Sequence, residues 1–154
     1  MKNNYLNVIS SIERIHRLFL EVIDCELIKL KITDINSTQA LLLYNIGEKV
    51  LSVGEISARG YYLGTNVSYN LKKITTAGYI EQNVATYDRR SSLIKLSKRG
   101  LQLYKTIDSA IIQQSNNIRK ESTINLDELA NTLGQVEIFF GKTVLQSSRT
   151  MMPN

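Results

Sequence analysis

Two glycines stand four residues apart in the stretch from Ala58 to Lys73, ahead of an amphipathic run that ends in two lysines. Such a stretch could cradle the phosphates of a nucleotide, or it could form the turn and second helix of a helix-turn-helix. A Walker A loop requires G-x-x-x-x-G-K-[ST], because its lysine reaches the terminal phosphates and its hydroxyl binds magnesium. Gly60 to Gly64 is one residue short, and Thr65-Asn66 follows where Lys-Ser is required. A Rossmann G-x-G-x-x-G pattern is missing as well, so the sequence argues against nucleotide binding.

The other interpretation is a helix from about Thr65 to Ala77, ended by Gly78. Val67, Leu71 and Ile74 recur at i, i+4 and i+7 and predict its buried face. The opposite face carries the candidate DNA contacts Thr65, Asn66, Ser68, Tyr69, Lys72 and Lys73. Asparagine can pair bidentately with adenine and serine or threonine with several bases, whereas lysines suit phosphates. The alternative is a solvated helix face that binds nothing.

Two short segments after this helix, Tyr79 to Val84 and Leu93 to Leu96, are strand candidates. The polar segment between them, Ala85 to Ser92, has the composition of a hairpin loop and contains the triplet Asp88-Arg89-Arg90. Ahead of the helix, Leu51 to Ile56 is compatible with a short strand or with the start of a short helix. The middle of the chain therefore predicts helices followed by a β-hairpin.

The distribution of charge singles out the same region. Residues 53–100 contain eight basic and three acidic side chains, which accounts for the whole formal net charge of +5. The flanking residues contain equal numbers of acids and bases. A segment with this asymmetry is a candidate surface for a polyanion, and the alternative is a charged face that only keeps the protein soluble.

Long helices are predicted on both sides of this region. Apolar residues at steps of three and four predict one helix from about Tyr5 to Leu30 and a second from about Ser37 to Glu48, capped by Asn36 or Ser37. Late in the chain, the pattern predicts a helix marked by Leu101, Tyr104, Ile107, Ile111 and Ile118. A last helix, capped by Asn125, carries an apolar stripe with the candidate dimer contacts Leu129, Leu133, Val136 and Phe140. Stripes this wide would leave a large exposed patch on a monomer, which a twofold dimer would bury.

Composition excludes several classes of function. The chain has 154 residues, 43% of them apolar, which is one domain's worth with a real core. It shows no membrane span and no secretory signal, so we expect a cytoplasmic protein. One cysteine, Cys25, and one histidine, His16, cannot build a disulfide or a structural zinc site, and we expect neither metal nor cofactor. No catalytic constellation is recognisable, so we do not expect an enzyme.

The order of these elements resembles the MarR family of winged-helix regulators over almost the entire chain. The most specific elements are Asp88-Arg89-Arg90, which matches the family's Asp-x-Arg in the wing, and Leu96-Ser97-Lys98-Arg99-Gly100, which matches Leu-Ser-x-x-Gly. The segment Gly60 to Leu63 departs from the family's pattern, because two tyrosines lengthen or reshape the turn before the recognition helix. The resemblance implies a mainly α fold with a small β-hairpin wing, an α+β winged helix-turn-helix with a helical dimerisation region.

What the resemblance implies for function follows residue by residue. One MarR-like domain spans 1–154, with a DNA-binding lobe at 36–100 and a dimerisation region formed by 1–35 and 101–154. The partners are double-stranded DNA and a second copy of the chain. Asp88 matches the acid that holds the wing by pairing with an arginine, and Arg90 matches the arginine inserted into the minor groove, where narrow grooves concentrate negative potential. Arg89 is expected to contact phosphate or to pair with Asp88.

Members of this family often bind small aromatic effectors between their first, second and fifth helices. The matching candidates here are His16, Phe19, Ile23, Cys25, Leu41 and Tyr44. Plain core packing is the alternative for each, because cores contain the same mixture of aromatic and aliphatic side chains. Cys25 lies between Asp24 and Glu26, whose negative charges oppose a redox role for its thiol. A winged helix that binds only protein partners is the rival interpretation, and it would not need the localised charge.

Overall fold

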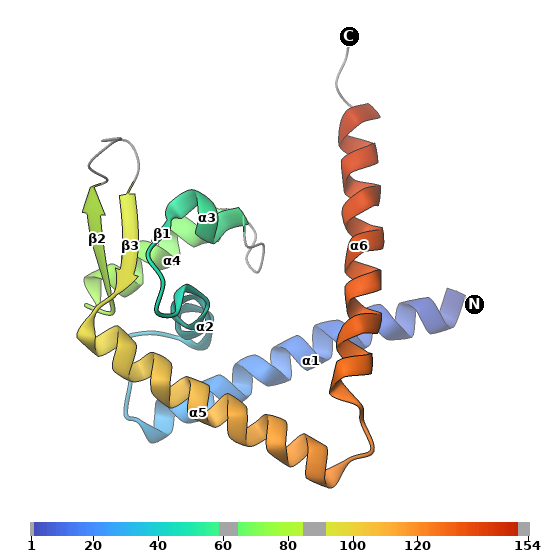
Figure 1. Cartoon of the computed structure of the whole chain (residues 1–154), viewed down its shortest axis with the longest axis horizontal. Helices are drawn as coiled ribbons and strands as arrows, with labels where there is room; N and C mark the ends of the chain where they lie inside the picture. Colours follow the sequence, from blue (N-terminus) through green and yellow to red (C-terminus); the bar gives the residue numbers. More distant parts are fainter. Residues whose placement is uncertain (1, 59–64, 85–91, 151–154) are drawn as a thin grey trace. The chain divides into compact units, whose positions relative to one another are not determined.

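The computed structural model describes residues 2–58, 65–84 and 92–150. In chain order they form α1 (Lys2–Lys29), α2 (Ser37–Ile46), β1 (Leu51–Ser52), α3 (Val53–Ala58), α4 (Thr65–Thr76), β2 (Ile80–Val84), β3 (Ser92–Leu96), α5 (Lys98–Glu121) and α6 (Leu126–Thr150) (Figure 1). The chain divides into two compact units, Met1–Ala110 and Ile111–Asn154, so the boundary falls inside α5. None of the described helices is long and apolar enough to cross a membrane.

A small antiparallel sheet and three short helices form the centre of the first unit. The strands lie in the order β1-β3-β2. β2 and β3 pair from Ile80 opposite Leu96 to Val84 opposite Ser92, and Leu51 of β1 pairs with Ile94 on the other side of β3. Together with α3 and α4, this sheet confirms the predicted fold class, a mainly helical winged helix-turn-helix with a small β-hairpin.

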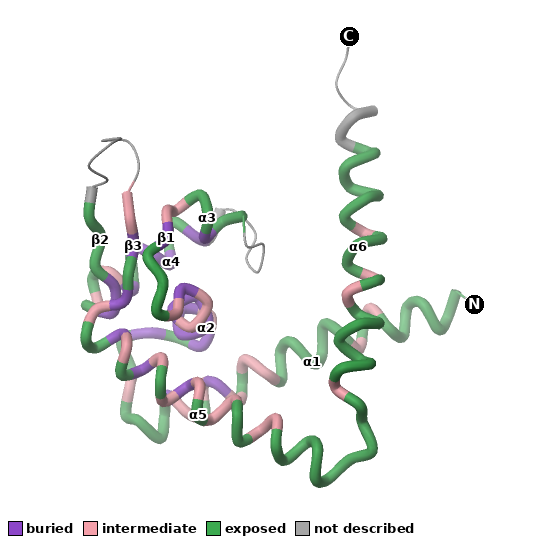
Figure 2. The backbone as a smooth tube through the Cα atoms, viewed as in Figure 1, coloured by how far each residue is buried: buried purple, intermediate pink, exposed green. Residues whose placement is uncertain are grey.

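The core of the first unit follows from the side-chain periods of these elements. On β3, Ile94 and Leu96 are buried and Lys95 between them is exposed, as the period of two requires. Figure 2 shows buried residues gathered on α2, on the strands and on the beginning of α5. The largest fully buried side chains in the described residues are Tyr79, Ile23, Leu42, Leu43, Ile46, Ile74, Ile94, Ile107 and Val67.

The ends of α2 are set by local hydrogen bonds. Asn36 is the N-cap: its side chain accepts a hydrogen bond from the backbone of Gln39, and the Gln39 side chain accepts one from the backbone of Asn36. Gly47 ends the helix with a φ of 59°, and its N–H donates to the Leu43 carbonyl. The helix therefore ends at Ile46, two residues before the predicted Glu48, because the chain turns at a glycine that accepts a positive φ.

The segment from Leu51 to Ile56, for which the sequence allowed a short strand or the start of a short helix, contains both. Leu51 and Ser52 form β1, and α3 begins at Val53. The Ser52 N–H donates to Glu55 Oε2 at 2.7 Å, and the Glu55 N–H donates to Ser52 Oγ at 3.2 Å. This reciprocal pair is a capping box, which stops the strand and starts the helix within one residue.

α1 is largely exposed within the first unit. Among its described residues, Ile23 and Leu27 are buried, both near the carboxyl end. Large apolar side chains along the rest of the helix are exposed: Tyr5, Leu6, Val8, Ile12, Ile15, Leu18 and Ile28. The predicted apolar stripe of α1 is thus buried only near its carboxyl end, where α1 packs against α2.

The second unit consists of the carboxyl half of α5 followed by α6. The side chain of Asn125 accepts hydrogen bonds from the N–H groups of Asp127 and Glu128, at 3.1 and 3.2 Å, which confirms the predicted N-cap. Asp127 and Glu128 also place negative charge in the first turn, where the helix dipole favours it. Most described residues of α6 are exposed (Figure 2).

Candidate nucleic-acid interface

α4 separates apolar and polar residues onto two faces. Val67, Leu71 and Ile74 are buried, as their spacing predicted. Ser68, Tyr69, Lys72 and Lys73 are exposed, and 58% of Tyr69 is accessible to solvent. Thr65 and Asn66 occupy the first turn of α4, but their side chains lie outside the described residues. The helix therefore presents a continuous polar face to solvent while its apolar face holds it in the core.

The two lysines are available for an external anion. Neither Lys72 nor Lys73 forms an ion pair with any residue that the structure describes. The Lys73 Nζ lies 5.5 Å from the centre of the Tyr69 ring, one turn earlier on the same face. That contact directs the charged end of the lysine toward the amino end of α4. Charge and hydrogen-bonding groups are thereby gathered on one side of the helix.

The β2–β3 hairpin has the position and register of a wing. Its two strands are held by the ladder that runs from Ile80 opposite Leu96 to Val84 opposite Ser92. An exposed ion pair between Lys95 Nζ and Glu81 Oε2, at 3.0 Å, lies across this ladder and contributes little to its stability. The predicted tip residues Asp88, Arg89 and Arg90 lie outside the described residues. Their roles therefore stay predictions.

One basic residue of the middle segment has a partner that the sequence count did not include. Arg99 pairs with Asp34, which lies between α1 and α2, with 2.9 Å between Arg99 Nη2 and Asp34 Oδ2. Lys95 pairs with Glu81, which lies inside the segment. The formal charge excess of residues 53–100 thus overstates the positive charge that is free to bind an anion. Lys72 and Lys73 are more available for such binding than Arg99 and Lys95.

The six residues proposed to line an effector cavity differ in exposure. Ile23 and Leu41 are buried and Phe19 and Tyr44 are half-buried, whereas His16 and Cys25 are exposed. Cys25 lies two positions from Ile23, about 200° around the helix, and so on the opposite face of α1. The sequence could have indicated this separation, because Phe19 and Ile23 are four residues apart and Cys25 does not share their period.

Tyr44 holds α2 against α5. Its hydroxyl donates to Asp108 Oδ1 at 2.9 Å, and its ring stacks on Tyr104 with 5.3 Å between ring centres. Burial raises the pKa of Tyr44 to about 12, and the hydrogen bond to Asp108 acts in the same direction. These contacts give Tyr44 a packing role.

The four predicted dimer contacts form the apolar side of α6. Leu129 and Leu133 are exposed in the single chain, and Val136 and Phe140 are half-buried. The rings of Phe139 and Phe140 meet edge to face with 5.7 Å between their centres. Within the described residues, no group of three or more His, Cys, Asp or Glu side chains is arranged to hold a metal ion.

A family model described as the MarR family matches residues 33–91, from the connection before α2 into the segment after β2. The chain is also similar to the exopolysaccharide II synthesis transcriptional activator ExpG of Rhizobium meliloti (strain 1021). The two are 35% identical over 139 residues, which is 89% of this chain and 72% of ExpG. The chain belongs to the MarR family of transcriptional regulators.

Solved structures share the fold of this MarR-family chain. Reduced AbfR bound to DNA, a protein of Staphylococcus epidermidis, has a TM-score of 0.71 and 18% identity, over 93% of this chain and 97% of AbfR. The S. aureus MepR–DNA complex has a TM-score of 0.67 and 18% identity, over 86% of this chain and 96% of MepR. In the MarR-family fold, α3 and α4 form the helix-turn-helix and the β2–β3 hairpin is the wing.

Proposed function

We propose that this protein is a sequence-specific regulator that binds double-stranded DNA as a homodimer, on a pseudo-palindromic operator, in the cytoplasm. The observation that carries the proposal is the polar face of α4, where exposed Ser68, Tyr69, Lys72 and Lys73 lie over a buried apolar face. A recognition helix needs this division, because one face must enter the major groove while the other stays in the core. The similar AbfR and MepR structures contain DNA, which supports the same use here.

The proposed contacts divide by chemistry. The polar groups at the amino end of α4, on Thr65, Asn66, Ser68 and Tyr69, meet base edges. Lys72 and Lys73 bind phosphates and supply affinity that depends on salt. In the wing, Arg90 enters the minor groove, Arg89 binds phosphate and Asp88 holds the hairpin tip. The DNA-binding lobe is residues 36–100.

The proposed dimer uses residues 1–35 and 101–154. Exposed apolar side chains along α1 and α6 support it, since an isolated chain rarely leaves so many large apolar groups in water. A twofold interface would bury Leu129, Leu133, Val136 and Phe140 against their counterparts in the second copy. It would also place two recognition helices on half-sites about one helical turn apart.

A small aromatic effector is the proposed signal, with His16, Phe19, Ile23, Cys25, Leu41 and Tyr44 as its candidate contacts. Ile23 and Leu41 are buried and Phe19 and Tyr44 are half-buried, which supports an apolar floor, and His16 is exposed. Cys25 lies on the opposite face of α1 from Ile23 and has the least support as a contact. An effector that favours the state unable to bind DNA should weaken operator binding roughly 5- to 150-fold, and operator should weaken effector binding equally. Thermal-shift screening of aromatic acids and phenols, followed by calorimetry with and without operator, measures both affinities.

At the level of individual members, the segment Arg59 to Lys73 is similar to LdtR, which is named for control of an L,D-transpeptidase gene. That similarity covers one segment, so it supports no proposal for the target gene. Genomic footprinting identifies the targets directly.

The experiment that tests DNA binding is selection of bound duplexes, followed by affinity measurement over a range of salt concentrations. We expect a site with two related half-sites and a logarithmic affinity that falls steeply with the logarithm of salt concentration. Failure to bind any duplex would favour the rival winged-helix module that binds only protein partners.

A further inference from the structure

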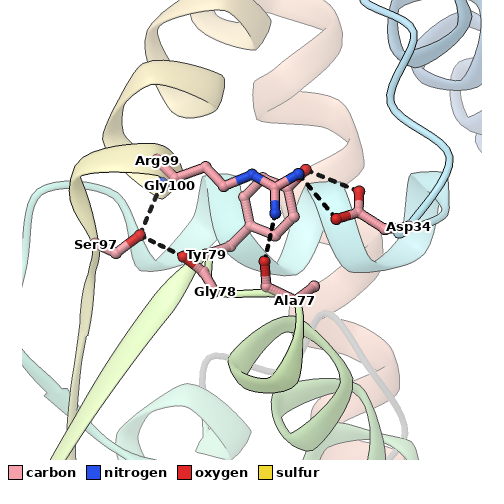
Figure 3. A network of polar contacts seen from close by, with 7 residues as sticks. All are labelled: Asp34, Ala77, Gly78, Tyr79, Ser97, Arg99 and Gly100. Carbon is pink, nitrogen blue, oxygen red and sulfur yellow. Dashed lines mark hydrogen bonds and ion pairs between the residues drawn. The ribbon is translucent and has the colours of Figure 1, made fainter.

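The carboxyl end of α4 is held by the residues that begin α5 (Figure 3). Arg99 Nη1 donates to the Ala77 carbonyl at 2.6 Å, and Ser97 Oγ donates to the Gly78 carbonyl at 2.7 Å. The Ser97 N–H donates to the Tyr79 carbonyl at 3.0 Å. Three consecutive carbonyls after α4 are thus bound by two residues of the Leu-Ser-x-x-Gly motif.

Asp34 joins this cluster from the connection between α1 and α2. Its Oδ1 accepts a hydrogen bond from the Tyr79 hydroxyl at 3.0 Å, and its Oδ2 pairs with Arg99 Nη2 at 2.9 Å. The Arg99 guanidinium also lies over the Tyr79 ring, 4.1 Å from its centre. Figure 3 shows Arg99 between the carboxylate of Asp34 and the carbonyl of Ala77. One carboxylate therefore fixes both side chains at the end of the recognition helix.

We propose that Asp34, Tyr79 and Arg99 are positioning residues that set the angle at which α4 meets DNA. The inference rests on the proposed function. α4 has 12 residues, so it is about 18 Å long, and a tilt of about 5° at its carboxyl end moves its amino end by about 1.5 Å. Groups that read base edges must be held within about 0.5 Å, so a small loss of restraint at one end matters at the other.

The solvent exposure of the Arg99 and Asp34 side chains favours a positioning role over a purely stabilising one. The side chains of Arg99 and Asp34 are 53% and 39% exposed. Ion pairs with this much solvent contact contribute little to the free energy of folding. Arg99 still donates a directional hydrogen bond to the Ala77 carbonyl, and Asp34 still accepts one from the Tyr79 hydroxyl, so the pair selects one geometry for the chain that follows α4.

The chain offers a control with the same change of charge. Glu81 and Lys95 form a second half-exposed ion pair in the same lobe, with side-chain exposures of 51% and 46%, and no contact of this pair reaches the carbonyls that follow α4. Asp34→Asn and Glu81→Gln each remove one negative charge. By charge alone, both substitutions should leave DNA binding unchanged or tighten it. A loss of affinity in Asp34→Asn alone would therefore come from geometry.

The first measurement is affinity for the selected operator by fluorescence anisotropy, at several salt concentrations and well below the melting temperature. We expect Asp34→Asn to weaken operator binding about three- to thirtyfold, with an unchanged salt slope and poorer discrimination against a scrambled site. Glu81→Gln should bind as the unaltered protein or more tightly, and Asp34→Glu, which keeps a carboxylate, should recover part of the loss. Asp34→Asn that is folded and binds operator as tightly as Glu81→Gln would overturn the proposal.

A second measurement works without DNA. Amide hydrogen exchange at Ala77, Gly78 and Tyr79 should be faster in Asp34→Asn than in Glu81→Gln, and Tyr79→Phe, which removes only the hydroxyl, should show a smaller change in the same direction. Equal exchange rates in Asp34→Asn and Glu81→Gln would end the inference even if the protein binds DNA. If no duplex binds but exchange changes as expected, the proposed DNA binding is wrong. The restraint that Asp34, Tyr79 and Arg99 place on the end of α4 is then still supported.

Discussion

Gln39 on α2 donates a hydrogen bond from Nε2 to Oδ1 of Asn70 on α4, at 3.2 Å, and both side chains are buried. The Oε1 of the same Gln39 side chain accepts from the Asn36 N–H in the capping box of α2. Both ends of one amide are therefore used, one to start α2 and the other to hold the inner face of α4. The predicted inner face of α4 was wholly apolar, and Asn70 is its polar exception.

Asn70→Ala should lower the free energy of unfolding by about 1–3 kcal/mol, because it leaves the buried Nε2 donor of Gln39 without an acceptor. Ser68→Ala is the matched control on the exposed face of the same helix, and it should stay within about 0.5 kcal/mol of the unaltered protein. Urea unfolding measures both. Equal losses for the two variants would show that the amide pair is not responsible.

Gly100→Ala should prevent stable folding of the first unit. A Cβ at position 100 would lie 2.0 Å from the Tyr79 carbonyl oxygen, which is backbone and cannot rotate away. We expect a cost of about 3 kcal/mol or more, since the strand and helix must move apart. Gly54→Ala in α3 is the control, because its Cβ would meet Ser52 Oγ at an ordinary 3.9 Å. Melting temperatures compare the two, and a Gly100→Ala protein that melts like Gly54→Ala would contradict the close approach.

Asn66→Ala and Lys72→Ala should weaken DNA binding in different ways. If Asn66 reads a base edge, its loss costs roughly 1–3 kcal/mol at the best site and flattens the preference at one base pair. Lys72→Ala should weaken all sequences alike and make the salt slope shallower by roughly 0.9 for each phosphate that is no longer neutralised. Affinities for a panel of single-base variants distinguish the two. A weakening independent of sequence for Asn66→Ala would mean that α4 is oriented differently.

Leu133→Asp combined with Val136→Asp should give monomers or unfolded chains, because two carboxylates would have to be desolvated in the proposed dimer interface. Sedimentation reports the mass, and circular dichroism reports whether the chain is folded. Operator binding should be abolished as well, since both half-sites must be engaged together. A folded and fully dimeric double variant would place the interface elsewhere.

Stability should fall between pH 10 and pH 12 through two tyrosines. Burial raises the pKa of Tyr79 to about 12, and its hydrogen bond to Asp34 adds to the effect; burial and Asp108 raise the pKa of Tyr44 to about 12. In the unfolded chain both hydroxyls ionise near 10, so unfolding releases protons in this window and rising pH favours it. The stabilisation is complete below pH 10 and is lost as the pH approaches 12.

Urea unfolding across that window measures this decline. Tyr79→Phe and Tyr44→Phe should each flatten it, and in an absorbance titration each substitution should remove one late-ionising tyrosine. A decline that is as steep in the double Phe variant would assign the effect to other groups.

The regular parts of the fold could be predicted from sequence because they repeat. Val67, Leu71 and Ile74 fix the inner face of α4 through a period that is visible without any partner. The cap at Asn125 was predictable for a similar reason, since the signal lies within one turn of the helix it starts.

The pairing of Asp34 with Arg99 could not be predicted in this way. The two residues are far apart in the chain, and neither a charge count nor a period indicates which acid meets which base. The same holds for Gln39 and Asn70. The orientation of the α4 residues could be predicted from their local spacing. The arrangement of the effector candidates was harder to predict, because it depends on packing between residues that are distant in the sequence.

Because Asp34 binds the Tyr79 hydroxyl with one oxygen and the Arg99 guanidinium with the other, the three residues cannot vary independently. Loss of the acid leaves a buried hydroxyl and a bound guanidinium without their acceptor, whereas loss of either donor leaves a carboxylate half satisfied. Lys98 lies beside Arg99 in the chain, is exposed and takes no part in the cluster, so position 98 is free of this constraint. Among related sequences, the residues at positions 34, 79 and 99 should therefore be conserved together or change together, while the residue at position 98 varies independently of them.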